Sequence, residues 1–338
     1  MKVNRDILYE ILTKISSGVD QTGIVEQFSN VIFDGKALIT YNDELFFYNP
    51  FETDFTCSVD ATDLLKSVKS IKEPEFRMSL RDNKLMIVSA STKAAFSVES
   101  GDKAYEIISK LSIHKITEWE ELPEDFTKGL YLCQFSASTN MGKGVLVSVY
   151  VEGNCIWTSD EVRMTKYVMN GKINKDVLIP AKAIPELVKI PIRYYNFSEN
   201  WGFFKTENNV IIATRLMTGE YPVLDHLFET EGELYTLPTS LKSLVEGIDF
   251  MVEGDTPLDK VIEVQIEPGK VLCTASKREN WIRKIGKFDY KGPSLKFLVN
   301  PKFLMEILDK TNEVWVGDNI ATFRSAKNFA HVLSLAKL

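Results

Sequence analysis

Cysteine, histidine and long apolar runs are scarce in this 338-residue sequence, and each shortage narrows the possible functions. The longest apolar runs, such as Val210–Ala213, are far too short to span a membrane. The first six residues lack the apolar stretch of a signal peptide, so we expect a cytoplasmic protein with no membrane partner. The four cysteines are widely scattered without a CxxC pair, which favours reduced, buried thiols over disulfides or a zinc site; they are Cys57, Cys133, Cys155 and Cys273.

Motifs of nucleic-acid-processing enzymes are also missing from the sequence. It contains no GxxxxGK[ST], GxGxxG, HExxH or GxSxG pattern, and Gly142-Lys143 lacks the glycine that a phosphate-binding loop needs five residues earlier. The three histidines, His114, His226 and His331, are far apart and have no acid or thiol at motif spacing. The carboxylates follow no pattern that would build a metal pair. We therefore expect no catalytic residue, metal or cofactor, with a nucleic-acid-processing enzyme as the less favoured alternative.

An excess of positive charge is absent as well, because the net charge is −7. This value argues against a protein that coats nucleic acid over its whole surface. A basic face would still attract DNA, because salt screens the interaction between charged patches that lie about 8 Å or more apart, so negative patches elsewhere would not cancel it. The hydrophobic share of 44% and the charged share of 26% are those of an ordinary globular protein, long enough for two or three domains.

What the sequence does contain is an internal repeat. A short pattern, glycine, any residue, three apolar residues and threonine, begins at Gly35, Gly153 and Gly269, which lie 118 and 116 residues apart. A strand-like run precedes each glycine, and a glycine tolerates the positive φ of a hairpin turn. One copy would be a common strand start, but three evenly spaced copies indicate a repeated strand–turn–strand unit.

A second pattern follows each copy of the first. Apolar strands lead into short helices that open at Ala61, Ala181 and Pro301, which are spaced 120 residues apart. Asp60 and Asn300 are placed to cap two of these helices. We expect the helices at Leu64–Ile71, Ile184–Ile190 and Phe303–Leu308, each followed by a hairpin that turns near residues 82–83, 207–209 and 317–319.

A further helix is expected upstream of each glycine. A helical stripe of apolar residues covers residues 7–15 after a possible Asn4 cap, and another covers residues 241–248. The middle copy, residues 126–135, is weaker. Together the repeats predict an α+β chain of three similar domains, 1–120, 121–232 and 233–338, each made of two helix-plus-antiparallel-sheet halves. The acidic segments Glu118–Glu124 and Glu229–Glu233 are typical of linkers between domains.

This organisation resembles the bacterial DNA polymerase III beta subunit, the sliding clamp, over the whole chain. The order and spacing of five segments carry the resemblance: Thr158–Met164, Val177–Lys182, Arg215–Pro222, Val299–Leu304 and Ser334–Leu338. The resemblance implies the DNA-clamp fold in a diverged or phage-encoded member. It further implies a processivity factor, a head-to-tail homodimeric ring that encircles duplex DNA in the cytoplasm. Such a ring tethers DNA polymerase and clamp loader through a peptide-binding pocket between domains 2 and 3.

The clamp resemblance also implies a basic inner face formed by helices, because a sliding ring attracts phosphates without reading bases. These lysines could instead be solvated helix faces, and several have acidic neighbours. The candidate DNA contacts are Arg5, Lys14, Lys66, Lys69, Lys72, Lys143, Lys182, Lys189, Lys242, Lys302 and Lys310.

The partner-peptide pocket carries over residue by residue. Glu161 and Val162 replace the family's glycine and histidine, and Leu335 replaces a proline, so we expect a different peptide to be recognised. Val149, Val162 and Ile320 could instead belong to the core. The full set is Val149, Ser159, Glu161, Val162, Arg163, Met164, Pro222, Leu227, Ile320, Ser334, Leu335, Ala336, Lys337 and Leu338.

The protomer interface of the family corresponds here to Phe96 and Val98 against Phe250 and Met251. A clamp-fold adaptor that binds protein partners without encircling DNA stays open as an alternative function. It is raised by the loop Ser16–Gly23, where the family carries a DNA-touching arginine and this chain has only an aspartate as a charged residue. Ring closure separates the two functions, because an adaptor can be monomeric.

Overall fold

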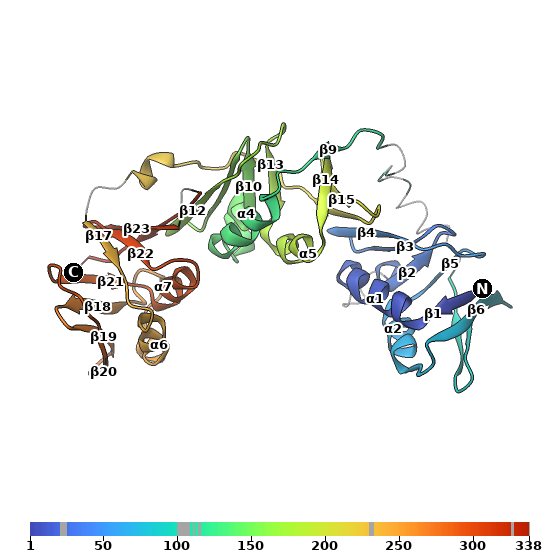
Figure 1. Ribbon diagram of the computed structural model, residues 1–338, viewed down its shortest axis with the longest axis horizontal. Coiled ribbons are helices and arrows are strands. Elements are labelled where there is room, and N and C mark those ends of the chain that lie inside the picture. Colours follow the sequence, from blue (N-terminus) through green and yellow to red (C-terminus); the bar gives the residue numbers. More distant parts are fainter. Residues whose placement is uncertain are drawn as a thin grey trace. The chain divides into compact units, whose positions relative to one another are not determined.

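The computed structural model describes residues 1–20, 26–99, 109, 111, 113, 116–229, 233–325 and 328–337. The chain divides into two compact units, unit 1 with Met1–Glu124 and Lys182–Met217, and unit 2 with Asp125–Ala181 and Thr218–Leu338. Each unit holds one four-stranded and one eight-stranded antiparallel sheet together with short helices (Figure 1). No helix in the described part of the chain is long and apolar enough to cross a membrane. The division into three domains stays a prediction.

Unit 1 contains helices α1 (Arg5–Ile15), α2 (Ala61–Ser70) and α5 (Ile184–Lys189). Its four-stranded sheet has the order β1 (Lys2–Asn4), β6 (Glu75–Arg81), β7 (Lys84–Val88) and β8 (Lys93–Ser97). The order of its eight-stranded sheet is β5 (Cys57–Asp60), β2 (Asn30–Phe33), β3 (Ala37–Tyr41), β4 (Leu45–Pro50), β16 (Ile211–Arg215), β15 (Trp201–Thr206), β14 (Ile192–Phe197) and β9 (Glu120–Glu121).

Unit 2 contains helices α4 (Phe126–Cys133), α6 (Leu241–Glu246) and α7 (Pro301–Leu308). Its four-stranded sheet has the order β20 (Asn280–Lys287), β19 (Lys270–Lys277), β18 (Ile262–Glu267) and β21 (Leu295–Val299). The order of its eight-stranded sheet is β13 (Val177–Pro180), β10 (Ser148–Glu152), β11 (Cys155–Ser159), β12 (Arg163–Val168), β24 (Phe329–Ser334), β23 (Ile320–Ser325), β22 (Glu313–Val316) and β17 (Glu233–Thr236).

The two eight-stranded sheets follow the same plan. In each, four strands from one stretch of sequence join four strands from a distant stretch, through the β4–β16 pair in unit 1 and the β12–β24 pair in unit 2. Helices α1 and α2 pack together in unit 1, and α6 and α7 do so in unit 2 (Figure 1). The repeat predicted from the sequence therefore appears as a repeated sheet-and-helix-pair plan.

The helix starts confirm the predicted caps. Asn4 Oδ1 accepts from the amides of Asp6 and Ile7 at 3.0 and 3.1 Å, and Asp60 Oδ1 accepts from the Asp63 amide at 2.7 Å. The Asn300 side chain caps α7 in the same way. These bonds satisfy amides that a helix start otherwise leaves unpaired. Helices α2 and α7 therefore begin at Ala61 and Pro301, where the second pattern opens, and the expected ranges from Leu64 and Phe303 began three and two residues too late.

The predicted hairpins are also confirmed. Gly35, Gly153 and Gly269 have φ of 89°, 56° and 84° in the β2–β3, β10–β11 and β18–β19 turns. A side chain is disfavoured at such angles, which explains the recurrence of glycine at the start of each repeat. The β6–β7, β15–β16 and β22–β23 hairpins turn where the second pattern placed them.

Candidate functional site

Arg163, at the start of β12, connects several elements of unit 2. Its side chain is only 5% exposed; Nε donates to Asp160 Oδ2 at 2.9 Å, Nη2 donates to the Phe135 carbonyl at 2.7 Å, and Nη1 pairs with Glu306 of α7. The rings of Phe135 and Phe303 flank the guanidinium at 5.4 and 4.0 Å. All three guanidinium nitrogens are bonded inside the protein, so Arg163 fixes the β11–β12 turn to α7 rather than presenting a free charge.

The β11–β12 turn, residues 160–162, is stiffened by its own side chains. Asp160 Oδ1 accepts from the amides of Val162 and Arg163, both at 3.1 Å. Glu161 has a φ of 79°, the left-handed conformation that costs a non-glycine residue about 1 kcal/mol or more. This is the position where the clamp resemblance has glycine, a residue that adopts positive φ without a steric cost. The Glu161 carboxylate projects to Lys143 Nζ at 2.6 Å.

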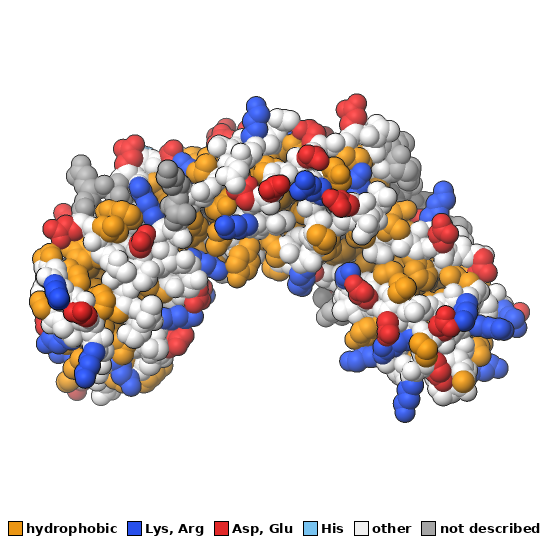
Figure 2. Space-filling view, viewed as in Figure 1, with side chains coloured by type: hydrophobic (Ala, Val, Ile, Leu, Met, Phe, Trp, Pro, Cys, Tyr) orange, Lys and Arg blue, Asp and Glu red, His pale blue; other side chains and the backbone are white. Residues whose placement is uncertain are grey.

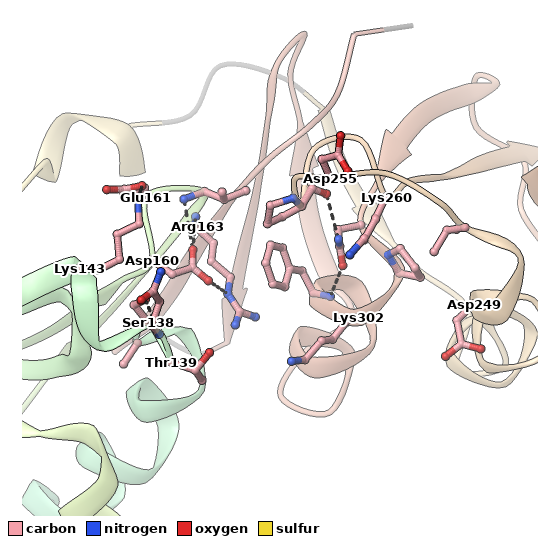
Figure 3. A pocket seen from close by; sticks show the side chains of 18 residues that line it. Ser138, Thr139, Lys143, Asp160, Glu161, Arg163, Asp249, Asp255, Lys260 and Lys302 are labelled. Atoms are coloured by element: carbon pink, nitrogen blue, oxygen red, sulfur yellow. Dashed lines mark hydrogen bonds and ion pairs between the residues drawn. The ribbon is translucent and has the colours of Figure 1, made fainter. Parts of the chain in front are cut away.

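A pocket of about 570 Å³ opens beside this turn, and we call it the charged pocket. Its walls come from residues 137–143, the β11–β12 turn, residues 249–260 and the start of α7. Figure 3 shows Lys143, Asp160, Glu161 and Arg163 on one wall and Lys302 on the opposite one. Four cationic side chains and four carboxylates line it, so no single sign of charge prevails: Lys143, Arg163, Lys260 and Lys302, with Asp160, Glu161, Asp249 and Asp255.

An apolar cluster lies on the opposite face of the same sheet. Met164 follows Arg163 in β12, and successive side chains of a strand point to opposite faces. The stacked rings of Tyr150 and Tyr221 lie 5.3 Å apart, and Lys166 Nζ lies 4.5 Å above the Trp157 ring. The cluster has a buried centre of Trp157, Met164, Phe228 and Val332, surrounded by the partly buried Tyr150, Cys155, Tyr221, Val223, Leu227, Ile320 and Ala330.

The candidate pocket residues gather around the β11–β12 turn and the chain end. Met164, Leu227 and Ile320 lie in the apolar cluster, while Glu161, Val162 and Arg163 line the charged pocket. Val149 is fully buried, Ser159 and Leu335 are buried, and Pro222 and Lys337 are exposed. The Ser334 amide donates to the Val162 carbonyl at 2.9 Å, and Ala336 bridges to Leu298. Leu338 lies outside the described residues.

Sequence reasoning missed the aromatic members of the apolar cluster, namely Tyr150, Trp157, Tyr221 and Phe228. Tyr150 and Trp157 sit directly opposite each other in the β10–β11 pair. Their register could have been read from the Gly153 hairpin, because a hairpin turn sets which side chains share a face. Tyr221 and Phe228 lie in the connection before β17, where no periodic signal is available.

The candidate DNA contacts differ in their pairing. Seven are in ion pairs with nearby carboxylates: Arg5 with Asp6, Lys14 with Glu10, Lys143 with Glu161, Lys182 with Glu44, Lys189 with Glu186, Lys242 with Asp309 and Lys302 with Glu306. In the described part of the chain, Lys66, Lys69, Lys72 and Lys310 have no ion-pair partner, although Lys310 Nζ lies 4.4 Å above the Tyr131 ring. Figure 2 shows lysine and arginine side chains mixed with acidic ones on the face in view.

The candidate interface residues lie on or just after the outer strand β8 of one four-stranded sheet and beside the inner strand β19 of the other. Phe96, in β8, is opposite Leu85 of β7, and Val98 follows the strand. Phe250 is 67% exposed in a short 3-10 helix, Asp249–Met251, that contacts β19 in unit 2. Met251 is half-buried beside it.

Burial suppresses the reactivity of the titratable groups that lie in the cores. It raises the pKa of the Cys57 and Cys273 thiols to about 12, and it holds the pKa of Cys133 well above its usual value. Burial, together with the nearby Arg163 charge, holds the pKa of His331 well below its ordinary value. No group of three or more metal-binding side chains occurs among the described residues, whereas His114 lies outside them.

Comparison with known proteins finds the same fold. No family model and no curated protein sequence matches the chain. The beta subunit from DNA polymerase of Streptococcus pyogenes matches with a TM-score of 0.82 at 16% identity, over 100% of this chain and 99% of that one. The Bacillus subtilis DNA polymerase sliding clamp gives 0.80 at 16% identity, over 100% and 98%. A Bartonella birtlesii sliding clamp (DNA polymerase III subunit beta) bound to griselimycin gives 0.82 at 17%, over 100% and 99%. The chain therefore has the sliding-clamp fold, and the predicted fold class is confirmed.

Proposed function

We propose that this chain is a diverged DNA polymerase III beta subunit, from a bacterium or a phage, that serves as a DNA polymerase processivity factor. Two copies close head to tail into a ring around duplex DNA in the cytoplasm, and the ring tethers a polymerase and a clamp loader. The observation that carries the proposal is the match in fold over the full length of structures described as sliding clamps.

The partner-peptide site is proposed at the β11–β12 turn of unit 2. A short peptide would bury apolar side chains against the apolar cluster, while its polar groups meet the charged pocket at the other side of the turn. Glu161 and Lys143 pair with each other at the pocket rim, so a ligand must either displace this pair or bind beside it. We expect a peptide that differs from those of other clamps, because Glu161 and Val162 change the rim.

Griselimycin, which the Bartonella birtlesii clamp binds, is a ready probe for this site. A Leu227→Asp variant should lose at least 10-fold in affinity for labelled griselimycin, because a carboxylate in the apolar cluster is costly to desolvate. Leu234→Asp is a matched control, since Leu234 is exposed on β17 of the same unit. Equal losses in both variants, or none in either, would reject this location. Separately, a host polymerase tail peptide binding as tightly as it binds its own clamp would reject the altered specificity.

Contact with DNA is proposed for the unpaired lysines. Lys66 and Lys69 lie on α2 and Lys72 follows it, all three exposed and without an ion-pair partner in the described residues. Weak, mobile contacts of this kind suit sliding, whereas bidentate arginine contacts would hold the ring in place.

The adaptor alternative differs from the clamp in its mass. If the chain is a clamp, sedimentation equilibrium at micromolar concentration should give twice the 38.4 kDa mass of one chain. A monomer at every concentration would favour the adaptor and reject the ring. Nuclease or NTPase activity that one carboxylate substitution abolishes would instead revive the enzyme alternative.

A further inference from the structure

One row of side chains crosses the face of the unit 2 sheet that carries the apolar cluster. Directly opposite partners on neighbouring strands run from Trp157 in β11 to Lys166 in β12, Ala330 in β24 and Arg324 in β23. Such partners lie about 5 Å apart and project from the same face of the sheet. Trp157 and Ala330 belong to the apolar cluster, so two cationic side chains flank a small residue beside it. We call Lys166, Ala330 and Arg324 the cationic row.

Both cations of this row rest on tryptophan rings. Lys166 Nζ lies 4.5 Å from the centroid of the Trp157 ring, and the Arg324 guanidinium lies 5.2 Å from that of Trp315. Arg324 Nη2 also donates to the Phe228 carbonyl at 2.6 Å. A cation that is already restrained on a ring loses less conformational freedom when it binds an anion. The two charges are therefore preorganised on either side of Ala330.

The charges of the cationic row are only partly balanced. Among the described residues, one carboxylate pairs with it: Asp225 Oδ1 lies 2.7 Å from Lys166 Nζ. The Lys166 side chain is 20% exposed, whereas that of Asp225 is 62% exposed. Arg324 is half-buried and has no ion-pair partner in the described part of the chain. An exposed ion pair is worth little, so another carboxylate can replace Asp225 at small cost.

Hydrogen-bond donors are in excess on the same face. Trp157 Nε1 and Arg324 Nε are buried and have no hydrogen-bond partner among the described residues. Thr322 lies two residues before Arg324 in β23 and shares its face, and its hydroxyl also lacks a partner there. Indole and guanidinium N–H groups can only donate. This face therefore lacks acceptors, which a carboxylate supplies.

We propose that the cationic row is a carboxylate subsite beside the apolar cluster. It binds an aspartate or glutamate side chain of the partner peptide whose apolar side chains enter the cluster. The incoming carboxylate replaces Asp225 at Lys166 and lies over Ala330, toward Arg324. Asp225 already places an acidic side chain against Lys166, and the remaining positive charge favours a second one. The proposal rests on the proposed peptide site and adds the chemistry of its ligand, an acidic apolar peptide.

The acidic side chain should contribute measurably to binding. A hydrogen bond between a partly buried cation and a carboxylate typically changes affinity by about 10-fold or more. The affinity should also fall as the salt concentration rises, since salt screens the partly exposed charges. A peptide in which an amide replaces the carboxylate should lose both effects.

The test starts by selecting short peptides from a random phage-displayed library on the full-length protein. One selected acidic peptide and its twin, with Gln for Glu or Asn for Asp, are then labelled, and fluorescence anisotropy measures both affinities. The wild type should bind the acidic peptide about 10-fold more tightly than the amide twin. The Lys166→Met, Arg324→Met double variant should bind the two equally, because methionine keeps the apolar chain but not the charge.

A matched control removes two cations elsewhere in unit 2. Arg283 lies 5.8 Å from the centroid of the Trp281 ring, and both Arg283 and Lys284 are on β20. The Arg283→Met, Lys284→Met variant changes the net charge equally and should keep the preference of about 10-fold. Asp225→Asn should raise the affinity for the acidic peptide by up to about 5-fold and leave that for the amide twin unchanged. Circular dichroism and melting temperatures show which variants are folded, and each single methionine variant should reduce the preference in part.

Two results would overturn the carboxylate subsite while leaving the peptide site intact. In the first, the selected peptides are not enriched in acidic residues, or they bind no more tightly than their amide twins. In the second, the preference for the acidic peptide persists in the double variant, which would place the carboxylate elsewhere. A wild-type chain that selects no peptide and does not bind griselimycin would instead reject the proposed peptide site itself.

Discussion

Replacing Lys66, Lys69 and Lys72 by glutamine should flatten the salt dependence of DNA binding. Each lysine that neutralises a phosphate contributes about 0.9 to the slope of log K against log salt concentration. These three lysines have no ion pair in the described residues, so all three are available to phosphates. The triple variant should therefore lose a slope of up to about 2.7 per protomer, which corresponds to about 40-fold in affinity between 50 and 200 mM salt. Fluorescence anisotropy of a short linear duplex measures both quantities.

The matched control replaces Lys14, Lys182 and Lys189, which change the net charge equally within the same unit. Each of these lysines already pairs with a carboxylate. A lysine that breaks such an exposed ion pair to contact a phosphate loses about 0–1 kcal/mol, which reduces the free energy gained from the phosphate contact. The loss of slope in the control variant should be less than half the loss in the Lys66, Lys69 and Lys72 variant. Equal losses would show that net charge alone sets DNA affinity, and the reasoning from local pairing would be wrong.

Three further predictions concern unit 2. Arg163→Met should lower the unfolding free energy by about 3 kcal/mol, because Asp160 and Glu306 lose the nearly buried charge that pairs with them. Thermal unfolding measures this loss, with Lys310→Met as the control. Equal melting temperatures of the two variants would contradict the prediction. His331 is buried and its pKa is lowered in the folded state, so as pH falls the unfolded state takes up the proton before the folded state does. The free energy of unfolding should therefore be at its full value above pH 6.5 and should fall by about 1.4 kcal/mol per pH unit below it. Urea titrations from pH 8 to 5.5 should show this slope in the wild type, and a His331→Phe variant with the same slope would refute its origin. Gly129→Ala should destabilise the protein by about 1–3 kcal/mol, although alanine has the better helix propensity, because the added Cβ would lie 2.6 Å from the Ile156 side chain. An unchanged or higher melting temperature would show that the neighbouring side chains can move aside.

The features that the sequence predicts well are local ones. The hairpin at Gly153 needs positive φ, and the cap at Asp60 needs only an oxygen three residues before an amide, so both are visible in a short window. Recurrence at nearly constant spacing then extends this local information to the repeated plan of the fold.

Features that depend on distant segments could not be predicted from the sequence. Lys182 pairs with Glu44, 138 residues away, and this pairing decides whether a lysine is available to DNA. The stacking of Tyr150 on Tyr221 joins a strand to a connection without periodicity. Such contacts are set by how strands pair across the long sheets, and neither periodicity nor composition records that pairing.

Retention on circular DNA tests the encircling ring most directly. The protein is incubated with nicked circular plasmid, a candidate clamp loader and ATP, the complexes are isolated by gel filtration, and the plasmid is then cut once. A closed ring should stay on the circle and be lost when the plasmid is linearised, because the link is topological. Retention that survives linearisation would mean ordinary surface binding and would contradict the encircling ring.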